Sequence, residues 1–324
     1  MQINLLKKRL DLKVNWKLSR NETLYKENFF IQIIENGQEF LGEIAPNIRY
    51  GESRDVILEN FDKLEKKSLS LRSLNETWNI NSFCHSFKFG VESALVHYEA
   101  FKANKSVSEF LEIDQSLGLI PTSFSVPIMD EKNLEEYLSN LSRFPFIKIK
   151  VNQDNAISFV KNIARYTNSP LRVDGNEAWE TLSKYKEFEK KCCDLNIQFI
   201  EQPFKAKAVD LYKELKKDSL FEIMADESIE DSADFSEIAK QFDSVNIKLM
   251  KTGGYYNAIR LLKEAKKYNL KTMIGCMIET SVGISSAMNL SSLGDYFDLD
   301  GSLLLKNDPY DLIFESNGFL TLKN

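Results

Sequence analysis

The sequence has no apolar run of about 18 residues, the length that a membrane-spanning helix requires. Its first 18 residues alternate apolar with basic side chains, without the continuous apolar core of a secretory signal peptide. Basic residues are not in excess either, because 42 Lys and Arg stand against 48 Asp and Glu, for a net charge of −6. We therefore expect a cytoplasmic protein that binds neither nucleic acid nor a membrane.

Cysteine and histidine are scarce. The four cysteines show no CxxC spacing, and two of them, Cys192 and Cys193, are adjacent on a probable helix. This pattern favours buried or inert thiols over a disulfide or zinc framework. The two histidines, His85 and His97, have no supporting partners in the sequence, so we interpret both as structural.

The first third of the chain is organised differently from the rest. Residues 10–18, 29–34 and 38–42 have strand-like alternation, and residues 55–74 and 93–104 have helical periodicity. Antiparallel strands followed by helices predict an α+β module, which we place at residues 1–118. The length of 324 residues suits such a module beside a barrel of roughly 200 residues.

The second region, residues 119–302, alternates apolar strands with amphipathic stretches. The expected strands are 123–127, 146–151, 171–173, 197–200, 223–225, 245–249, 272–275 and 297–299. The expected helices include 156–166, 182–195, 209–217 and 255–268. Eight strands with intervening helices predict a closed parallel barrel of the α/β class. The remaining residues, 303–324, leave little room for an eighth helix, and we expect this tail to return to the N-terminal module.

Polar residues stand at the ends of the expected strands, at intervals of about 22 to 27 positions. The carboxyl ends of barrel strands open onto one face, so these side chains should converge on one pocket. Asp174, Glu201 and Asp226 would supply three hard oxygen ligands, which suit Mg²⁺. No His or Cys accompanies them, which argues against zinc. Taken singly, each acid could instead be a helix cap or a loop residue.

Three lysines complete this pocket. Lys148 and Lys150 are two positions apart, so both point to the same side of a strand. If they face the interior, each ammonium opposes the other's charge, which lowers the pKa of one and makes a neutral amine base accessible. An exposed strand edge rich in lysine is the alternative. Lys248 would approach from across the barrel, so that one lysine could remove a proton from a substrate and the other could return one to the opposite face.

Several strings in these segments resemble the enolase superfamily, and within it the muconate-lactonizing-enzyme subgroup. They are IKIKV at 147–151, DGN at 174–176, IEQP at 200–203, ADES at 225–228, NIKLMKTGG at 246–254 and GEIAP at 42–46. The resemblance implies a (β/α)₇β modified TIM barrel with an N-terminal α+β capping domain. It also implies Mg²⁺ held by Asp174, Glu201 and Asp226, acid/base roles for Lys150 and Lys248, and a pKa-tuning role for Lys148.

Dipeptide epimerases of this subgroup carry a DxD pair at the eighth strand that holds the substrate's α-ammonium, and this chain has Asp298 and Asp300 there. Residues 275–287 are also similar to the epimerases, which implies substrate contacts from Met277 and Ile278. Arg20 lies where members that act on Ala-Glu carry an arginine, although an exposed loop arginine is an equal interpretation. Residues 47–52 are a second candidate lid.

The resemblance implies an isomerase that inverts the α-carbon of the C-terminal residue of Ala-Xaa dipeptides, derived from murein, by two-base 1,1-proton transfer with Mg²⁺. The alternatives are an o-succinylbenzoate synthase or an N-succinylamino acid racemase on the same scaffold. A rival of another class is a catalytically silent barrel that binds a ligand. The expected partner is a small dipeptide, and the sequence leaves the second residue and any homo-oligomer open.

Overall fold

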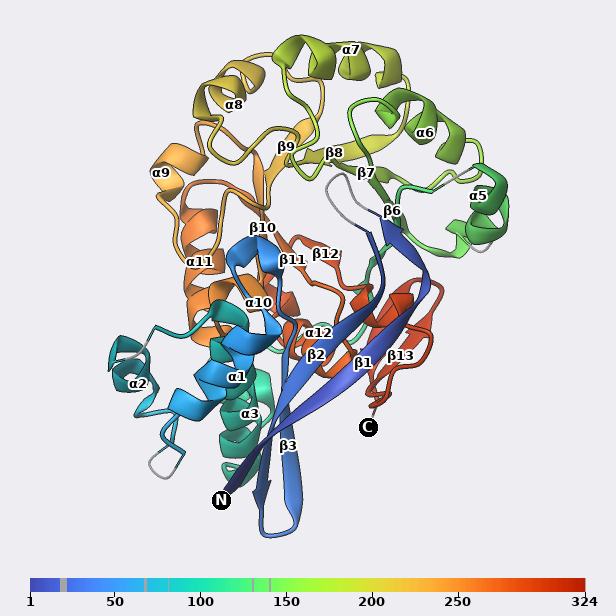
Figure 1. Cartoon of the computed structure of the whole chain (residues 1–324). Coiled ribbons are helices and arrows are strands. Elements are labelled where there is room, and N and C mark those ends of the chain that lie inside the picture. Colours follow the sequence, from blue (N-terminus) through green and yellow to red (C-terminus); the bar gives the residue numbers. More distant parts are fainter. Residues whose placement is uncertain (18–21, 67–68, 81, 130, 140, 324) are drawn as a thin grey trace.

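The computed structural model describes residues 1–17, 22–66, 69–80, 82–129, 131–139 and 141–323. The chain begins with a three-stranded antiparallel sheet in the order β1-β2-β3, visible as the long blue ribbons of Figure 1. Its strands are β1 (Gln2–Lys17), β2 (Glu22–Glu35) and β3 (Gln38–Ile44). Strand β1 begins well before residue 10, where the sequence predicted it, because its first residues pair with the end of β2, from Gln2 opposite Ile34 onward.

Helical segments follow this sheet in the chain. They are η1 (Ile48–Tyr50), α1 (Arg54–Lys63), α2 (Leu74–Ile80), α3 (His85–Lys102) and α4 (Val107–Phe110). Helix α3 packs closely on β3, where a Cβ on Gly42 would lie 1.9 Å from the carbonyl oxygen of Gly90. The single helix predicted for residues 55–74 is wrong. Helix α1 ends at Lys63 because Leu64 adopts an extended backbone and turns, with Leu69, into the core of this module.

The barrel consists of eight parallel strands that neighbour one another in chain order. They are β5 (Ser123–Val126), β6 (Phe146–Lys150), β7 (Leu171–Asp174), β8 (Ile197–Glu201), β9 (Glu222–Ala225), β10 (Ser244–Lys248), β11 (Lys271–Gly275) and β12 (Tyr296–Asp298). Each predicted strand is confirmed to within one residue at either end.

Helices surround the strands, as the arc of α6, α7 and α8 in Figure 1 shows. The connections contain α5 (Glu131–Leu138), η2 (Leu141–Arg143), α6 (Ala156–Ile163), α7 (Leu182–Cys192), α8 (Val209–Leu215), α9 (Phe235–Ile238), α10 (Leu249–Thr252), α11 (Tyr255–Lys267), α12 (Ser281–Met288) and η3 (Ser291–Leu293). Between β12 and β13 the described residues form only the short η4 (Gly301–Leu304). The (β/α)₇β architecture with an N-terminal α+β domain is therefore confirmed.

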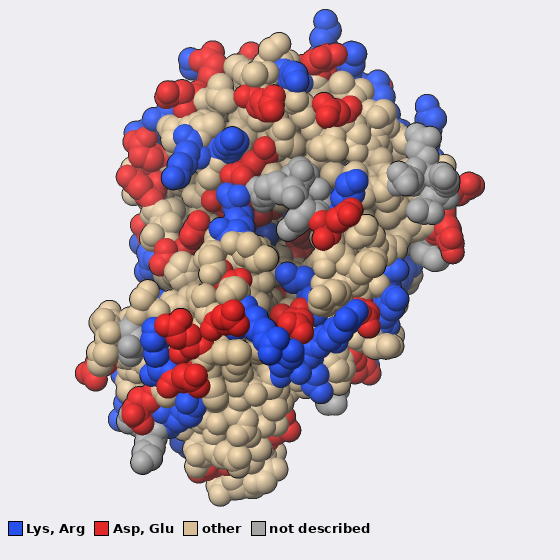
Figure 2. All heavy atoms as spheres, in the orientation of Figure 1, with Lys and Arg blue, Asp and Glu red and all other residues tan. Residues whose placement is uncertain are grey.

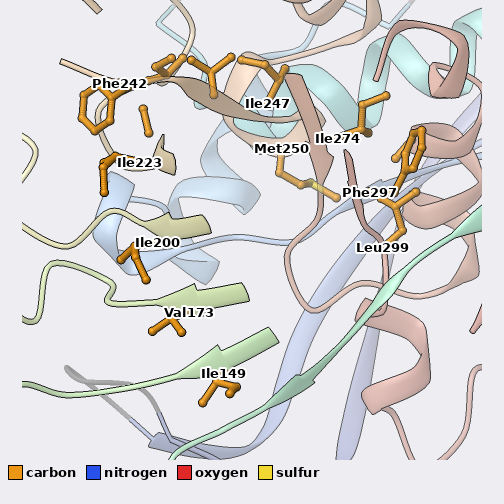
Figure 3. Close-up of a cluster of buried hydrophobic side chains, with 14 of the residues drawn as sticks. Ile149, Val173, Ile200, Ile223, Phe242, Ile247, Met250, Ile274, Phe297 and Leu299 are labelled. Carbon is orange, nitrogen blue, oxygen red and sulfur yellow. The ribbon is translucent and has the colours of Figure 1, made fainter. Parts of the chain in front are cut away.

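Alternation along the strands separates the core from the pocket. Ile149, Val173 and Ile200 lie on neighbouring strands and belong to the main hydrophobic cluster between strands and helices, part of which Figure 3 shows. The residues on either side of Ile149 are Lys148 and Lys150, which must therefore point into the barrel. The apolar positions thus fix which side chains face the interior.

Side chains close the barrel between its first and last strands. In the described residues no backbone ladder joins β5 to β12. Instead, the Ser123 hydroxyl donates to Asp298 Oδ1 at 2.5 Å, the Ser125 amide donates to Asp300 Oδ2 at 2.6 Å, and the Leu299 amide donates to Thr122 Oγ1 at 2.8 Å. Two acids of the expected site thus also hold this seam together.

The tail of the chain contacts both modules. Leu305 pairs with Leu12 of β1, and the Lys306 amide donates to the Asp11 carbonyl oxygen at 2.9 Å. The final strands, β13 (Ile313–Ser316) and β14 (Phe319–Leu322), form an antiparallel sheet with β4 (Ile120–Pro121). The division into 1–118, 119–302 and a tail at 303–324 stays a prediction. Among the described residues no helix combines the length and apolarity needed to cross a membrane.

Candidate active site

The centre of the site is a buried cluster of charges at the carboxyl ends of three adjacent strands. Lys150, Asp174 and Glu201 occupy the last positions of β6, β7 and β8, and the register places Lys150 beside Asp174 and Asp174 beside Glu201. Lys148 Nζ lies 3.1 Å from Asp174 Oδ2, 2.7 Å from Glu201 Oε2 and 2.7 Å from Asp298 Oδ2. One ammonium therefore bridges acids from three strands.

Further lysines bind Asp174 and Asp226. Lys150 Nζ lies 2.5 Å from Asp174 Oδ2, and Lys248 Nζ lies 2.8 Å from Asp226 Oδ2. Lys251, on α10, donates to Asp226 Oδ1 at 2.5 Å. Lys251 was not predicted from the sequence, although its position three residues after Lys248, one helical turn on, was a usable signal. Lys150 and Lys248 thus belong to different acids on opposite sides of the cluster.

Electrostatics keep Lys148 and Lys248 protonated. Burial opposes the charge of Lys148, but Asp298, Glu201 and Asp174 outweigh it and raise the pKa of Lys148 well above its ordinary value. Burial likewise opposes the charge of Lys248, and Asp226 raises the pKa of that ammonium. Lys148 therefore stays a charged neighbour of Lys150, because carboxylates surround its ammonium.

The carboxylates suit a divalent cation by their chemistry. Asp174 and Glu201 are fully buried, and Asp226 is 3% exposed. Glu201 Oε1 accepts from Asn246 Nδ2 at 2.9 Å, whereas Oε2 has no directed hydrogen bond although Lys148 Nζ is 2.7 Å away. Burial and then the charge of Asp174 raise the pKa of Glu201 to about 7. A buried carboxylate that lacks sufficient positive charge is what a hard cation such as Mg²⁺ would stabilise.

The described side chains do not already form a metal-ligating group of three or more acids, histidines or cysteines. Ammonium groups of the lysines lie on the oxygens of Asp174, Glu201 and Asp226 instead. The donor set of three buried acids fits Mg²⁺, and the assignment of these residues as its ligands stays a proposal.

Asp298 and Asp300 differ in their surroundings, although the sequence treats them as a pair. Burial favours the neutral acid at Asp298, but Lys148 and Lys150 outweigh it and lower the pKa of this carboxyl group. At Asp300, burial and then the negative charge of Asp298 raise the pKa to about 7, while hydrogen bonds from Ser125 lower it. Within the described residues Asp300 forms no ion pair, so it suits a ligand's ammonium group.

A cavity of about 150 Å³ opens above this cluster, between the capping module and the barrel. Figure 2 looks onto this face, where basic and acidic side chains lie side by side near the centre. The expected substrate residues Met277 and Ile278 line the cavity. Arg20 lies outside the described residues. Lining residues that the sequence analysis did not propose for the site include Trp16, Thr23, Lys26, Ser125, Glu227 and Leu304.

The capping module covers the cavity through residues 47–52, the predicted lid. The guanidinium of Arg49 forms two hydrogen bonds of 2.8 Å with the carboxylate of Glu177, in the loop after β7. Tyr50, the next residue, lines the cavity. Glu52 accepts from the Asn47 amide at 3.1 Å, which closes this loop on itself. Both modules therefore contribute to the mouth of the site.

Lys26 of β2 places a cation in the capping half of the cavity. Its Nζ lies 3.5 Å from the Pro46 carbonyl oxygen. Burial lowers the pKa of this ammonium, and the charge of Glu52 raises it. Within the described ranges no carboxylate forms an ion pair with Lys26, so it can receive a negatively charged group of a ligand.

The histidines lie elsewhere. His97 Nδ1 is 3.2 Å from the Leu41 carbonyl oxygen and its Nε2 is 3.0 Å from the Tyr255 hydroxyl, so it joins β3 to α11. His85 Nε2 lies 3.2 Å from Asp231 Oδ2. Neither histidine lines the cavity. The four cysteines are free thiols.

Comparison with known proteins agrees with this geometry. Residues 130–299 match the family described as "Enolase C-terminal domain-like". The chain is 34% identical to an L-Ala-D/L-amino acid epimerase from Pedosphaera parvula over 99% of this chain and 96% of that protein. It is 29% identical to a protein of the same name from Flavobacterium johnsoniae, over 100% and 97% of the two chains.

A solved structure points the same way. A dipeptide epimerase from Enterococcus faecalis, complexed with Mg and the dipeptide L-Leu-L-Tyr, matches with a TM-score of 0.88 and 26% identity over 99% of this chain and 96% of that one. Fold and site thus define a barrel isomerase of the enolase superfamily. Within that superfamily the chain belongs to the dipeptide epimerases of the muconate-lactonizing-enzyme subgroup.

Proposed function

We propose that the protein is a Mg²⁺-dependent epimerase that inverts the α-carbon of the C-terminal residue of Ala-Xaa dipeptides. The observation that carries this proposal is the placement of Lys150 on β6 and Lys248 on β10, four strands apart in the eight-stranded barrel and each paired with a different buried acid. Two bases on opposite faces of one carbon can remove a proton from one side and deliver one to the other. That arrangement supports inversion.

In this proposal Asp174, Glu201 and Asp226 hold Mg²⁺. When bound, Mg²⁺ supplies positive charge that stabilises the negative charge developing beside the substrate's carboxylate. With their charge partly neutralised, Asp174 and Asp226 would bind lysine less tightly, which would leave Lys150 Nζ and Lys248 Nζ available to the substrate. One lysine accepts the α-proton as a neutral amine and the other donates a proton as an ammonium. Lys148, held by three acids, adds a fixed positive charge next to Lys150.

Asp300, with Asp298 beside it, would bind the α-ammonium of the dipeptide. A buried acid without a cation suits a protonated amine and would repel a succinyl carboxylate, which weighs against the succinylbenzoate synthase and N-succinylamino acid racemase alternatives. The complete set of bases and acids weighs against a silent binding barrel. Murein-derived peptides are the proposed natural source, and the cytoplasmic location stays a prediction.

The test is a dipeptide library incubated with the protein and Mg²⁺ in D₂O, scored by mass for deuterium gained at the α-carbon. We expect free Ala-Xaa dipeptides to gain one deuterium at the second residue. Exchange only with N-succinylated amino acids, or with none of the compounds, would contradict the proposal. A parallel assay with the succinylbenzoate precursor tests whether the protein is instead an o-succinylbenzoate synthase.

A further inference from the structure

Two buried acids meet at the amino end of α12, outside the charge cluster described above. Glu43 belongs to β3 of the capping module and is fully buried. Glu279 lies in the loop between β11 and α12 and is 3% exposed. Neither acid lines the substrate cavity, and neither forms an ion pair within the described part of the chain. Burial disfavours the charged form of each carboxyl group, so the other groups around it must decide whether it is ionised or protonated.

Glu43 holds the loop from the capping side. Its Oε2 accepts from the Thr280 hydroxyl at 2.7 Å and from the Gly283 amide at 2.9 Å, and its Oε1 accepts from the Thr280 amide at 2.9 Å. Asn28 of β2 donates both to Glu43 Oε1, at 2.8 Å, and to the Ile278 carbonyl oxygen, at 3.0 Å. Two strands of the capping sheet thus fasten the loop that carries Ile278.

Glu279 holds the same loop from within. Its Oε1 accepts from the Met277 amide at 2.7 Å. Its Oε2 faces Gly283, where a Cβ would lie 2.2 Å from this oxygen and 3.0 Å from Glu43 Oε2. The two carboxyl groups therefore flank the same point, which only a glycine leaves open.

Two buried carboxyl groups that flank one point repel each other when both are ionised, which favours the neutral form of one of them. Burial and then the charge of Glu43 raise the pKa of Glu279 to about 8, and burial also raises the pKa of Glu43. Among the other groups that act on the pair, Lys248 lowers the pKa of Glu279. Burial raises the pKa of Cys276 and of Tyr310, which keeps both neutral near pH 7.

We propose that Glu43 and Glu279 share one proton and act as a positioning pair that fixes residues 277–280, so that Met277 and Ile278 form a wall of the substrate cavity. The amino end of α12 and the amide of Asn28 favour the negative charge on Glu43. Glu279 carries the proton and avoids the repulsion. Loss of that proton would drive the two acids apart and release the loop. The activity readout rests on the proposed epimerase function, whereas the stability readout does not.

The first experiment compares the wild-type protein with Glu279→Gln across pH. Glutamine has the shape of the protonated acid and cannot ionise. We expect similar kcat/KM near pH 7, and a rise of roughly tenfold in the wild-type KM between about pH 7 and pH 9.5 that the variant does not show. An identical dependence of KM on pH in both proteins would overturn the proposal, and so would an unchanged KM in the wild type.

The second experiment changes Glu43. Glu43→Gln places an amide where the donors of Thr280 and Gly283 converge, so we expect KM to rise at least tenfold at every pH, with a smaller change in kcat. Glu39→Gln on the same strand is the matched control, because Glu39 is exposed. A Glu43→Gln variant with the control's KM would contradict the positioning role.

Thermal unfolding tests the pair without any substrate. The pKa of Glu279 is about 8 in the folded protein and higher than in the unfolded chain, so the folded state binds more protons between about pH 4.5 and pH 8. Wild-type Tm should therefore fall relative to that of Glu279→Gln as pH rises through this range. Parallel Tm curves would overturn the proposal even if epimerase activity were confirmed. Diverging curves without dipeptide turnover would refute only the proposed function.

Discussion

Asp300 shows how neighbours change the behaviour of one residue type. It lies two positions after Asp298. Lys148 forms an ion pair with Asp298, whereas the pKa of Asp300 is raised to about 7. Asp300→Asn should therefore lower kcat/KM on free Ala-Xaa dipeptides by about 30-fold or more, since the substrate ammonium would lose its charged partner. Steady-state kinetics measure this, with Asp311→Asn on the exposed tail as control. Equal losses in both variants would contradict the assignment.

The lysines on the two sides of the cavity floor should have separable roles. Lys150→Ala should still exchange the α-proton of one substrate epimer for deuterium, through Lys248, without net epimerization. Lys248→Ala should show the reciprocal behaviour. Proton NMR in D₂O with each pure epimer measures the exchange. If either variant loses exchange from both epimers while it still binds substrate, a one-base mechanism replaces this one.

Lys26 should favour an acidic second residue in the substrate. Lys26→Met removes an ammonium that forms no ion pair within the described residues from the capping half of the cavity, but keeps a side chain of similar length. We expect kcat/KM for Ala-Glu to fall roughly 3- to 10-fold while that for Ala-Leu is unchanged, the modest size reflecting a partly solvated charge. A parallel fall for both dipeptides would show that Lys26 supports the fold rather than selects the ligand.

At the scale of elements, alternation was a reliable guide and local helical periodicity was not. Barrel strands such as β6 and β7 were predictable because an apolar residue, Ile149 or Val173, stands between inward-facing polar ones. The helix expected over 55–74 failed because burial of Leu64 and Leu69 decides the chain path there, and burial depends on partners distant in sequence. The contact between Glu43 and Thr280 could not be predicted for the same reason, because the two residues are 237 positions apart in the sequence.

His97 makes the junction of β3 and α11 sensitive to acid. Burial lowers its pKa to about 4, whereas the unfolded chain has the ordinary histidine value, so the unfolded state binds more protons between about pH 6.5 and pH 4. Stability should therefore be lost as pH falls through this range. Because part of the residue is accessible, we expect about 1–2 kcal/mol. Urea unfolding near pH 7 and pH 4.5 should show a smaller loss in His97→Gln, and an equal loss would contradict this role.

At the scale of the whole molecule, the three acids at the strand ends should couple metal binding to stability. A ligand that binds only the folded state raises Tm by mass action. We expect Mg²⁺ to raise the Tm of the wild-type protein and chelator to abolish turnover. Glu201→Gln should show neither turnover nor a rise in Tm with Mg²⁺. Its far-ultraviolet circular dichroism should be unchanged. Full turnover in chelator, or in this variant, would refute the metal assignment.

The sequence predicted the charged residues at the strand ends but not the upper half of the cavity above them. Strand-end positions follow from the repeat of the barrel, so Lys150, Asp174 and Lys248 could be identified by spacing. Trp16 and Lys26 come from the antiparallel sheet of the other module, whose orientation over the barrel no local pattern specifies. Specificity is therefore the part of the function that needs the structure.

Ligand binding should change the rate of amide hydrogen exchange at the seam between β5 and β12. In the described residues the seam relies on side-chain bonds, so the amides of Ser125 and Leu299 should exchange with solvent deuterium sooner than amides within the ladder from β6 to β8. A ligand's ammonium on Asp300 would oppose that opening. Binding at the mouth would then appear as slower amide exchange along one edge of the barrel, without any change in its shape.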